Sequence, residues 1–596
     1  MKQVTNKLFK LLAVLTVVSL VFSSCQKDEE VFPVPTVTSA GSLSGVAGAT
    51  VTVKATISAP AGLKSITVLK NGVAFDSKTY SAGEKTAEYS KDYVVEGAAG
   101  SVVTFSIQAT DLKNQVSTIS GVSVNVTAIP PKAIVEVKGN LEGNITWTAD
   151  KIYKLVGFVR VGQEDVFGTI TKKGVLTIQA GTVIIGDRAS KGTLIVQRGS
   201  QIIANGTASA PIVFTSERAP GEREAGDWGG LVICGQAPNN LPDNSTSRQL
   251  EGGYGAFHGG TDPADNSGSL KYVRLEYAGI PINPNQEVNS LTLGSVGSGT
   301  TIDYVQASFG LDDSFEWFGG NVNAKHLIAY KGLDDDFDTD NGYSGYVQFG
   351  IGIRGSSLAD QSGSNGFESD NDATGSLNTP YTSAIFANMS IIGAKGAVNV
   401  AIDPLFQHGA QIRRSSKQKL YNTVITGYPY GVYIDGRNGK ARDHAAAGDI
   451  DLQNVIVAGV DGWGTNGFGL GWSVNVAPKG VPVPGFDNMT SLNNGTTTGL
   501  TAFTIGTAVP EDWFKSLTGN KILVSNANLG LSSTLWTAGR PTFALTAGTS
   551  ESLIGPKLKS DLPSFFEATD YVGAFKSTDW TSGWSEFSPQ SVVYVK

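Results

Sequence analysis

Two acidic loops bounded by glycine carry the residues best suited to chemistry. Residues Gly310–Gly320 read GLDDSFEWFGG and residues Gly332–Gly342 read GLDDDFDTDNG, so the second loop repeats the pattern of the first. A third stretch, Gly366–Asp372, reads GFESDND. If the loops stack, like charges lie about 4.8 Å apart and repel by roughly 3 to 4 kcal/mol at an effective dielectric of about 20. Such a column requires a cation, bound protons or abundant water.

The alignment of the three loops predicts two neighbouring columns of side chains. The aromatic column is expected to contain Phe315, Phe337 and Phe367. The carboxylate column is expected to contain Glu316, Asp338 and Glu368. A column of this kind would fix several carboxylates in one place, which is the arrangement that a metal site or an acid–base catalyst needs.

Oxygen ligands in loops bounded by glycine suit calcium. Ca²⁺ prefers carboxylate and amide oxygens, which Asp, Glu and Asn supply. The sequence therefore predicts a calcium site built from Asp335, Asp338, Asp340, Glu368, Asp370 and Asp372. These loops lack the spacing of an EF-hand, so acidic turns that point separately into solvent stay open as the alternative.

The same region also offers groups for acid–base catalysis. Paired carboxylates serve as acid and base in glycoside hydrolysis, whereas a lyase needs calcium together with an Arg or Lys base. The candidates for these roles are Asp312, Asp313, Asp334, Asp335, His326 and Arg413. The double aspartates resemble those of polygalacturonase-like enzymes, but the Gly-His-Gly and Arg-Ile-Lys signatures of that family do not appear in that form. A structural or solvent-facing role is therefore expected for His326 and Arg413.

Short β-forming segments recur along the chain and must position these loops. Gly174–Gly181 (GVLTIQAG) matches Gly192–Gly199 (GTLIVQRG). A pattern of Asn, a short β-run and Gly starts at Asn388, Asn422 and Asn454. Coils joined by turns of variable length produce such uneven spacing, whereas propeller blades or sandwiches give broader units. The pattern predicts a right-handed parallel β-helix over residues 135–596 with a C-terminal cap.

In such a coil, residues at equivalent positions of successive strands form columns. An inward column is expected from Val273, Val305 and Leu327. The three asparagines are expected either to form a buried ladder or to occupy exposed left-handed turn positions. The aromatic residues Trp580 and Trp584 are expected to cap the last coil, because an open coil end must be covered.

The N-terminus carries a secretory signal. Lysines precede the apolar run Leu11–Leu20, which is too short for a stable membrane span, and small residues lead into Cys25. The Ser-Ser-Cys ending resembles the lipobox of bacterial lipoproteins, and Gln26–Glu30 (QKDEE) resembles the surface-export signal of Bacteroidota lipoproteins. These resemblances imply a signal peptide over 1–24, lipidation of Cys25 and a tether over 25–35. An ordinary cleaved signal peptide is the alternative.

Residues 36–128 show the alternation of a small β-sandwich. Strands are expected at Val51–Ala55, Ile66–Leu69 and Val102–Ile107, with an Asn71-Gly72 turn after the second. The segment resembles the immunoglobulin-like modules common in surface proteins, although it lacks their Cys and Trp pair. The Ile-Pro-Pro sequence at 129–131 interrupts any strand, so a domain boundary is expected there.

Length and charge limit the classes of protein that fit. The chain has 596 residues, a net charge of −8 and a pI of about 5.3. Its length predicts two domains or one elongated repeat body, and its acidity argues against nucleic acid as a partner. Only two cysteines are present. If Cys25 is lipidated, Cys234 has no disulfide partner and is expected to be a small buried hydrophobic residue.

Several segments together resemble a poorly characterised family of Bacteroidota lipoproteins. Besides the acidic loops they are Gly192–Ser216, Gly226–Gly230 (GDWGG), Tyr571–Phe575 (YVGAF) and Trp580–Trp584 (WTSGW). The resemblance covers roughly residues 135–596. It implies an all-β chain with a pectin-lyase-like parallel β-helix after an immunoglobulin-like module, and an outer-membrane location, but no established reaction.

The sequence is compatible with three functions. The first is a lipid-anchored outer-membrane protein facing the medium, which binds glycans or an outer-membrane partner and holds Ca²⁺ as structural support. The second is a calcium-dependent polysaccharide lyase or a glycoside hydrolase centred on the acidic loops. The third is a passive adhesin or structural protein. The anchor, the spacer module and the incomplete catalytic signatures favour the first.

Overall fold

The computed structural model describes residues 30–594, except for 129, 243–247, 285, 356, 358, 397–400, 437, 461–507, 509, 524 and 544–552. The predicted signal peptide, Cys25 and the first residues of the predicted tether lie outside the described residues. The chain falls into two units, Met1–Pro131 and Lys132–Lys596, so the boundary in the sequence follows the proline pair. None of the described helices is long and apolar enough to cross a membrane.

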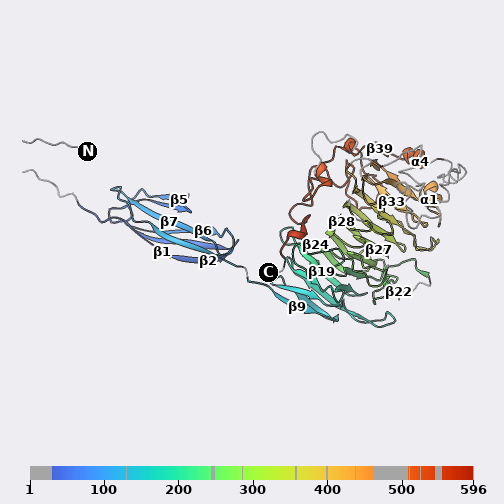
Figure 1. The fold of residues 1–596 in the computed structure, drawn as a ribbon, viewed down its shortest axis with the longest axis horizontal. Coiled ribbons are helices and arrows are strands. Elements are labelled where there is room, and N and C mark those ends of the chain that lie inside the picture. Colours follow the sequence, from blue (N-terminus) through green and yellow to red (C-terminus); the bar gives the residue numbers. More distant parts are fainter. Residues whose placement is uncertain are drawn as a thin grey trace, which may run out of the picture. The chain divides into compact units, whose positions relative to one another are not determined.

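The N-terminal unit is a β-sandwich of two sheets, drawn in blue in Figure 1. One sheet has the order β1 (Thr36–Ser39), β3 (Thr50–Ser58) and β6 (Thr86–Val94). The other has the order β2 (Ser42–Val46), β8 (Ser120–Thr127), β7 (Val102–Asp111), β4 (Leu63–Lys70) and β5 (Val73–Thr79). The predicted turn joins β4 to β5, and both Asn71 and Gly72 adopt a positive φ. Inward side chains of both sheets share one apolar core.

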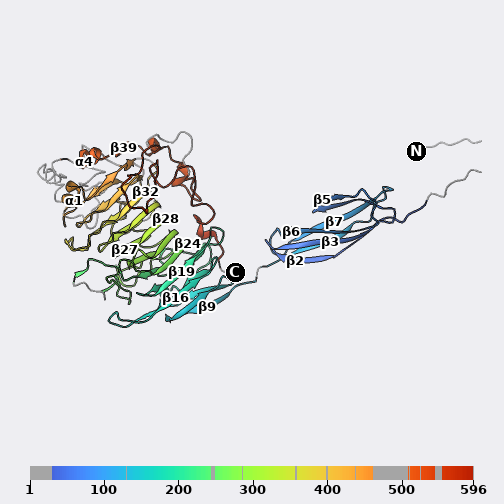
Figure 2. The same cartoon turned by 180° about the vertical axis from the view of Figure 1, so that it is seen from behind.

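The second unit is a parallel β-helix, which confirms the predicted fold. Its ten-stranded sheet runs in the order β10 (Asn140–Leu141), β13 (Phe158–Val161), β18 (Thr193–Val196), β21 (Leu231–Cys234), β25 (Leu291–Val296), β27 (Phe315–Gly320), β29 (Phe337–Asp340), β31 (Phe367–Ser369), β33 (His408–Ile412) and β36 (Tyr430–Ile434). Every neighbouring pair in this order is parallel. Figures 1 and 2 show these strands stacked coil upon coil.

A seventeen-stranded sheet forms the other wall of the coil. Its strands are β9 (Ala133–Val137), β11 (Gly143–Trp147), β12 (Lys151–Leu155), β16 (Gly174–Ile178), β17 (Val183–Gly186), β19 (Gln201–Asn205), β20 (Ile212–Ser216), β24 (Gly268–Glu276), β26 (Thr301–Ser308), β28 (Asn323–Tyr330), β30 (Tyr346–Ile353), β32 (Ile385–Ile392), β34 (Lys419–Tyr421), β35 (Val424–Thr426), β37 (Leu452–Gln453), β38 (Ile456–Ala458) and β39 (Lys521–Leu523). From β24 to β32, successive strands along the chain alternate between the two sheets. Neighbouring loops in the sequence therefore often lie on different sides of the coil.

The remaining elements are short. Two antiparallel hairpins project from the coil: β14 (Gln163–Glu164) with β15 (Ile170–Lys172), and β22 (Arg248–Gln249) with β23 (Phe257–His258). The helices are α1 (Ala441–Ala447) and α4 (Pro510–Ser516), with 3₁₀ turns η3 (Asn526–Leu529), η4 (Ser533–Trp536) and η5 (Pro589–Ser591).

The predicted columns are present in the interior of the coil. Val273 pairs in register with Val305, which pairs with Leu327, and all three side chains are fully buried. The rings of Phe315 and Phe337 lie 5.6 Å apart and nearly parallel, and Phe367 follows at 5.6 Å. This aromatic column fixes the start of β27, β29 and β31 and so fixes the acidic loops in front of them.

The three asparagines form the predicted ladder in left-handed turn conformations, and the expectation of exposed turn positions is wrong, because none of them is exposed. Asn388, Asn422 and Asn454 all adopt a left-handed φ, as turn residues do. Asn388 and Asn422 are nevertheless fully buried, and the Nδ2 of Asn454 donates to the Oδ1 of Asn422 at 2.9 Å. The amide of Asn388 donates to the carbonyls of Tyr571 and Gly573. The column therefore binds the C-terminal segment to the coil.

The C-terminal segment covers the flank of the coil, so the expectation that it caps the last coil is wrong. Figures 1 and 2 show it, in red, running from the last coils back towards the first. Trp580 packs edge-on against His326, and Trp584 packs against Tyr304. The physical reason is that the outer face of the seventeen-stranded sheet carries buried apolar side chains such as Ile351, which need a cover.

We predict that Phe337→Ala lowers the free energy of unfolding by about 3 to 5 kcal/mol, because it leaves a cavity in a column that has ring contacts above and below. Urea unfolding followed by circular dichroism measures this change. The matched control is Phe167→Ala, since Phe167 is 78% exposed and its truncation leaves no cavity. Equal unfolding midpoints for the two variants would contradict a stacked interior.

Candidate functional site

The acidic loops gather on one side of the ten-stranded sheet because their strands stack in register. Glu316 of β27 pairs with Asp338 of β29, which pairs with Glu368 of β31. The preceding residues Phe315, Phe337 and Phe367 are the buried aromatic column described above. Since side chains alternate along a strand, the carboxylates point away from the interior. The predicted carboxylate column is confirmed.

A buried cation holds the backbone of the second loop from inside the coil. Arg354 is fully buried, and its Nη1 lies 3.0 Å from an Asp336 carboxylate oxygen. The same guanidinium donates to the carbonyls of Gly332 and Asp334. Tyr428 adds a hydrogen bond to Asp336. The loop carbonyls are thus satisfied internally, while the carboxylate of Asp334 remains on the outer side.

A pocket of about 470 Å³ lies in front of these loops, and we call it the acidic pocket. Its carboxylates are Glu251, Glu287, Asp312, Asp313, Glu316, Asp334 and Asp360. The other lining residues are Asn289, Gln361 and Ser362. No Lys, Arg or His is among these lining residues, all of which belong to the described part of the chain. Seven carboxylates therefore share one small volume without a basic side chain in its wall.

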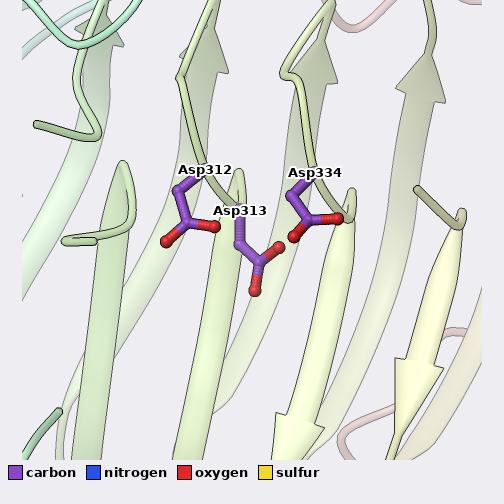
Figure 3. A group of neighbouring side chains, drawn as sticks. All are labelled: Asp312, Asp313 and Asp334. Carbon is purple, nitrogen blue, oxygen red and sulfur yellow. The ribbon is translucent and has the colours of Figure 1, made fainter. Parts of the chain in front are cut away.

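Two groups of three carboxylates in this region have the geometry of a cation site. In the first, ligand atoms of Asp312, Asp313 and Asp334 all lie within 4.8 Å of one another. Figure 3 shows the three carboxylates converging from neighbouring loops. In the second group, Asp313, Glu316 and Asp338 meet the same criterion. Asp313 belongs to both groups and therefore joins them.

Hydrogen bonds orient these groups but leave several oxygens unpartnered. The backbone N–H of Asp335 donates to Asp313 Oδ1 at 2.8 Å, and Ser362 Oγ donates to Asp334 Oδ2 at 2.8 Å. The side chain of Asn289 donates to Glu316. The buried Oδ1 atoms of Asn289, Asp334 and Asp338 have no hydrogen-bond partner among the described residues. Oxygens of this kind are what a hard cation such as Ca²⁺ takes as ligands.

Burial controls the protonation of the cluster. It raises the pKa of Asp312, Asp313 and Asp334 well above the usual range of an aspartate, and repulsion from neighbouring carboxylates raises these pKa values further. Burial likewise raises the pKa of Glu316 and Asp338. Without a cation, burial and mutual repulsion therefore favour the protonated forms of these carboxyl groups.

The structure brings only one of the six residues predicted as calcium ligands into a group of three carboxylates. Asp338 joins a three-carboxylate group, whereas Asp335 accepts the backbone N–H of Asn365 and Asp340 accepts that of Asn341. Asp372 accepts from Thr374 and Ser376 and so stabilises its own turn.

Glu368 and Asp370 are neutralised by basic residues of the next coil. Arg413 contacts Glu368 and places its Nε 2.8 Å from Asp370, and Arg414 contacts the same aspartate at 2.7 Å. Burial, together with repulsion from Asp335, still raises the pKa of Glu368 to about 8 despite Arg413. By contrast, the described residues that line the acidic pocket around Asp313 include no basic side chain.

The structure brings three of the residues proposed for catalysis together and places His326 and Arg413 elsewhere. Asp312, Asp313 and Asp334 come together in the acidic pocket. His326 lies on β28 of the other sheet, stacked between the rings of Tyr304 and Phe349, and its Nδ1 is 2.7 Å from Asp303. Because β28 belongs to the opposite wall of the coil, His326 is separated from the acidic pocket. Arg413 is engaged with two carboxylates.

Six residues of the pocket were not predicted from the sequence. They come from loops that share no repeated pattern with the acidic loops, and they are Glu251, Glu287, Asn289, Asp360, Gln361 and Ser362. Their positions depend on how these longer loops fold over the sheet. No local motif in the sequence marks them.

Comparison with known proteins decides the family. The model of the pectate-lyase-like β-helix domain matches residues 139–499, which is more than half of the chain. The chain belongs to this pectate-lyase-like β-helix family. The match begins just before β10, so it covers the ten-stranded sheet, the acidic pocket and the seventeen-stranded sheet except for β9 and β39. No curated protein matches the chain.

Two solved structures are similar to parts of this pectate-lyase-like β-helix protein. The fibronectin(III)-like modules of CbhA from Clostridium thermocellum are 22% identical, with a TM-score of 0.13 over 16% of this chain and 49% of theirs. The chain thus spans about half the length of those modules. The family 28 exopolygalacturonase of Yersinia enterocolitica is 10% identical, with a TM-score of 0.13 over 69% of this chain and 90% of the enzyme.

We predict that Ca²⁺ stabilises this protein, and more strongly at pH 8 than at pH 5. Because the folded-state pKa values of Asp312, Asp313 and Asp334 are raised, their contribution to stability is largest at low pH and is lost as pH rises through those values. Bound Ca²⁺ takes the place of the protons, so its effect grows with pH. A concentration 100 times the dissociation constant adds about 2.7 kcal/mol.

Thermal unfolding at both pH values, with Ca²⁺ or with a chelator, measures this effect. Mg²⁺ at the same concentration is the control, since it demands a smaller octahedral site. Identical unfolding midpoints with Ca²⁺ and with chelator at pH 8 would contradict a cation site in the acidic pocket.

Proposed function

We propose that this protein is a lipid-anchored protein of the outer membrane that binds glycans with Ca²⁺ held in the acidic pocket. The observation that carries the proposal is the convergence of Asp312, Asp313 and Asp334 in a pocket whose described lining has no basic side chain. The unpartnered amide oxygen of Asn289 lies in the same wall, and Asn289 is only 4% exposed. Carboxylate and amide oxygens together form the ligand set that Ca²⁺ prefers.

A calcium ion in this pocket would retain positions for ligand oxygens. Ca²⁺ takes about six to eight oxygen ligands, and the converging carboxylates with Asn289 supply only part of that number. Hydroxyl groups of a sugar complete such a coordination shell. Glu251, Glu287 and Asp360 remain as negative charges around it, so a neutral glycan fits better than an acidic one.

The family supports a carbohydrate ligand. Its description names a pectate lyase, and pectate is a polysaccharide. The N-terminal sequence supports the cell-surface part of the proposal, because the apolar run and Cys25 resemble a lipoprotein signal and QKDEE resembles a surface-export signal. A protein facing the medium meets polysaccharides before they enter the cell.

Glycoside hydrolysis is a second candidate function, and the same three aspartates favour it. A buried aspartate with a raised pKa keeps a proton that it donates to a glycosidic oxygen, while an ionised neighbour activates water or attacks the sugar. A lyase is less well supported, because the proposed base Arg413 is paired with Glu368 and Asp370.

We predict that Asp312→Asn and Asp334→Asn each weaken Ca²⁺ binding roughly tenfold or more, because each removes one charged ligand from the site. Isothermal titration calorimetry measures Ca²⁺ binding, and an array of neutral glycans with Ca²⁺ or chelator measures glycan binding. The matched control is Asp443→Asn, whose side chain is 68% exposed on α1.

Binding of glycans that is lost in both pocket variants and retained in Asp443→Asn supports the proposal. Release of new reducing ends from the bound glycans would instead assign hydrolysis to the three aspartates. Unchanged Ca²⁺ affinity in both variants would overturn the assignment of the site.

We also predict that Cys25→Ser releases the protein from the outer membrane, since it removes the residue expected to carry the acyl chains. Proteinase treatment of intact cells, followed by membrane fractionation, measures both exposure and anchoring. Ser24→Ala is the control, because it leaves the cysteine in place. An unchanged membrane-bound fraction for Cys25→Ser would contradict lipid anchoring.

A further inference from the structure

A second pocket lies on the first coils of the β-helix, beside the hairpin of β14 and β15, and we call it the hairpin pocket. Its volume is about 380 Å³, within the range of about 300 to 1,000 Å³ that small-molecule sites occupy. Its wall includes Arg160 of β13, Glu164 of β14, Gln197 after β18 and the loop around Tyr254. That loop, between β22 and β23, also supplies Glu251 to the acidic pocket.

Two buried acceptors in this wall lack hydrogen-bond partners. Gln197 is 2% exposed, and while its Nε2 donates to the carbonyl of Gly255, its Oε1 has no partner among the described residues. The side chain of Glu164 is 1% exposed; its Oε1 accepts from Arg198 at 2.9 Å, but its Oε2 has no partner in the described chain. Buried acceptors of this kind are normally satisfied, so both call for a donor from a ligand or from water.

Donors and acceptors are both fixed in place around the pocket. Arg160 donates from Nη2 to the carbonyl of Tyr254 at 2.8 Å and thereby holds the loop that forms one wall. The ring of Tyr254 stacks on Phe158 at 5.6 Å. The negative charge of Glu164 is compensated by Arg198. The wall is therefore polar and close to neutral, unlike that of the acidic pocket.

The β14–β15 hairpin ends in an exposed apolar turn that borders the pocket through Val166. Val166, which lines the pocket, is 81% exposed, and the adjacent Phe167 is 78% exposed. Asp165 accepts the backbone N–H groups of Phe167 and Thr169 at 2.9 and 2.8 Å, so these hydrogen bonds stabilise the backbone of the turn. An aromatic ring displayed in this way can pack on the apolar face of a sugar ring at a low cost in conformational entropy.

We infer that the hairpin pocket is a second, metal-independent subsite for a neutral sugar. Gln197 Oε1 and Glu164 Oε2 accept hydrogen bonds from sugar hydroxyls, and Phe167 covers the ring. The inference rests on the proposed glycan binding in one respect. We expect one extended glycan to reach both pockets across the β22–β23 loop, which lines both of them. The subsite itself needs no Ca²⁺, because the two acceptors assigned to the sugar are a carboxamide and a carboxylate already paired with arginine.

The test measures binding of neutral oligosaccharides of glucose, mannose, galactose and xylose to the purified full-length protein, with Ca²⁺ and with chelator. We expect weaker binding to persist in chelator. Phe167→Ser and Gln197→Met should each reduce that residual affinity about tenfold, since each removes one main contact with the sugar. Because Phe167 is exposed, its substitution leaves folding intact even where Gln197→Met does not. Asp443→Asn is the control and should leave the residual binding unchanged, because Asp443 is exposed on α1 and lines neither pocket.

Hydrogen exchange of residues 165–169 in chelator should slow when a binding oligosaccharide is added. If no oligosaccharide binds in chelator, or if Phe167→Ser leaves the residual affinity unchanged, the subsite is refuted. The two proposals fail separately. Loss of Ca²⁺-dependent binding alone would refute the acidic pocket, and loss of chelator-resistant binding alone would refute the hairpin pocket.

Discussion

Repulsion between stacked carboxylates is the constraint on which the rest of the structure depends. The parallel register places Glu316, Asp338 and Glu368 one above another on the ten-stranded sheet. At a ladder spacing of about 4.8 Å, each ionised pair costs roughly 3 to 4 kcal/mol at an effective dielectric of about 20. The aromatic column behind them prevents the strands from slipping to relieve it. Compensation must therefore come from a positive charge or from bound protons.

The two ends of this column meet the constraint differently. Around Glu368 and Asp370, the next coil supplies Arg413, so the charge is neutralised within the chain. Around Asp313 the described pocket wall offers carboxylates and an amide but no basic side chain. One end is thus a structural ion-pair network, and the other end is the place where we propose that Ca²⁺ binds.

The fold could be predicted from the sequence because the repeat itself encodes the register. The similar patterns of the two acidic loops predicted that Phe315 stacks on Phe337, and the structure confirms this stacking. The position of His326 was harder to predict, because successive strands alternate between opposite walls of the coil. The pocket residue Glu287 and the ion pairs of Arg413 were beyond prediction, since they depend on long loops and on a later coil with no repeated motif.

Anomalous diffraction from crystals soaked in a terbium salt would test the central claim most directly, because Tb³⁺ takes the oxygen ligands that Ca²⁺ takes and reports its own position. The account predicts a strong anomalous peak bounded by Asp312, Asp313 and Asp334, which disappears in Asp312→Asn crystals. Tb³⁺ peaks confined to exposed carboxylates elsewhere, with none among these three residues, would contradict it.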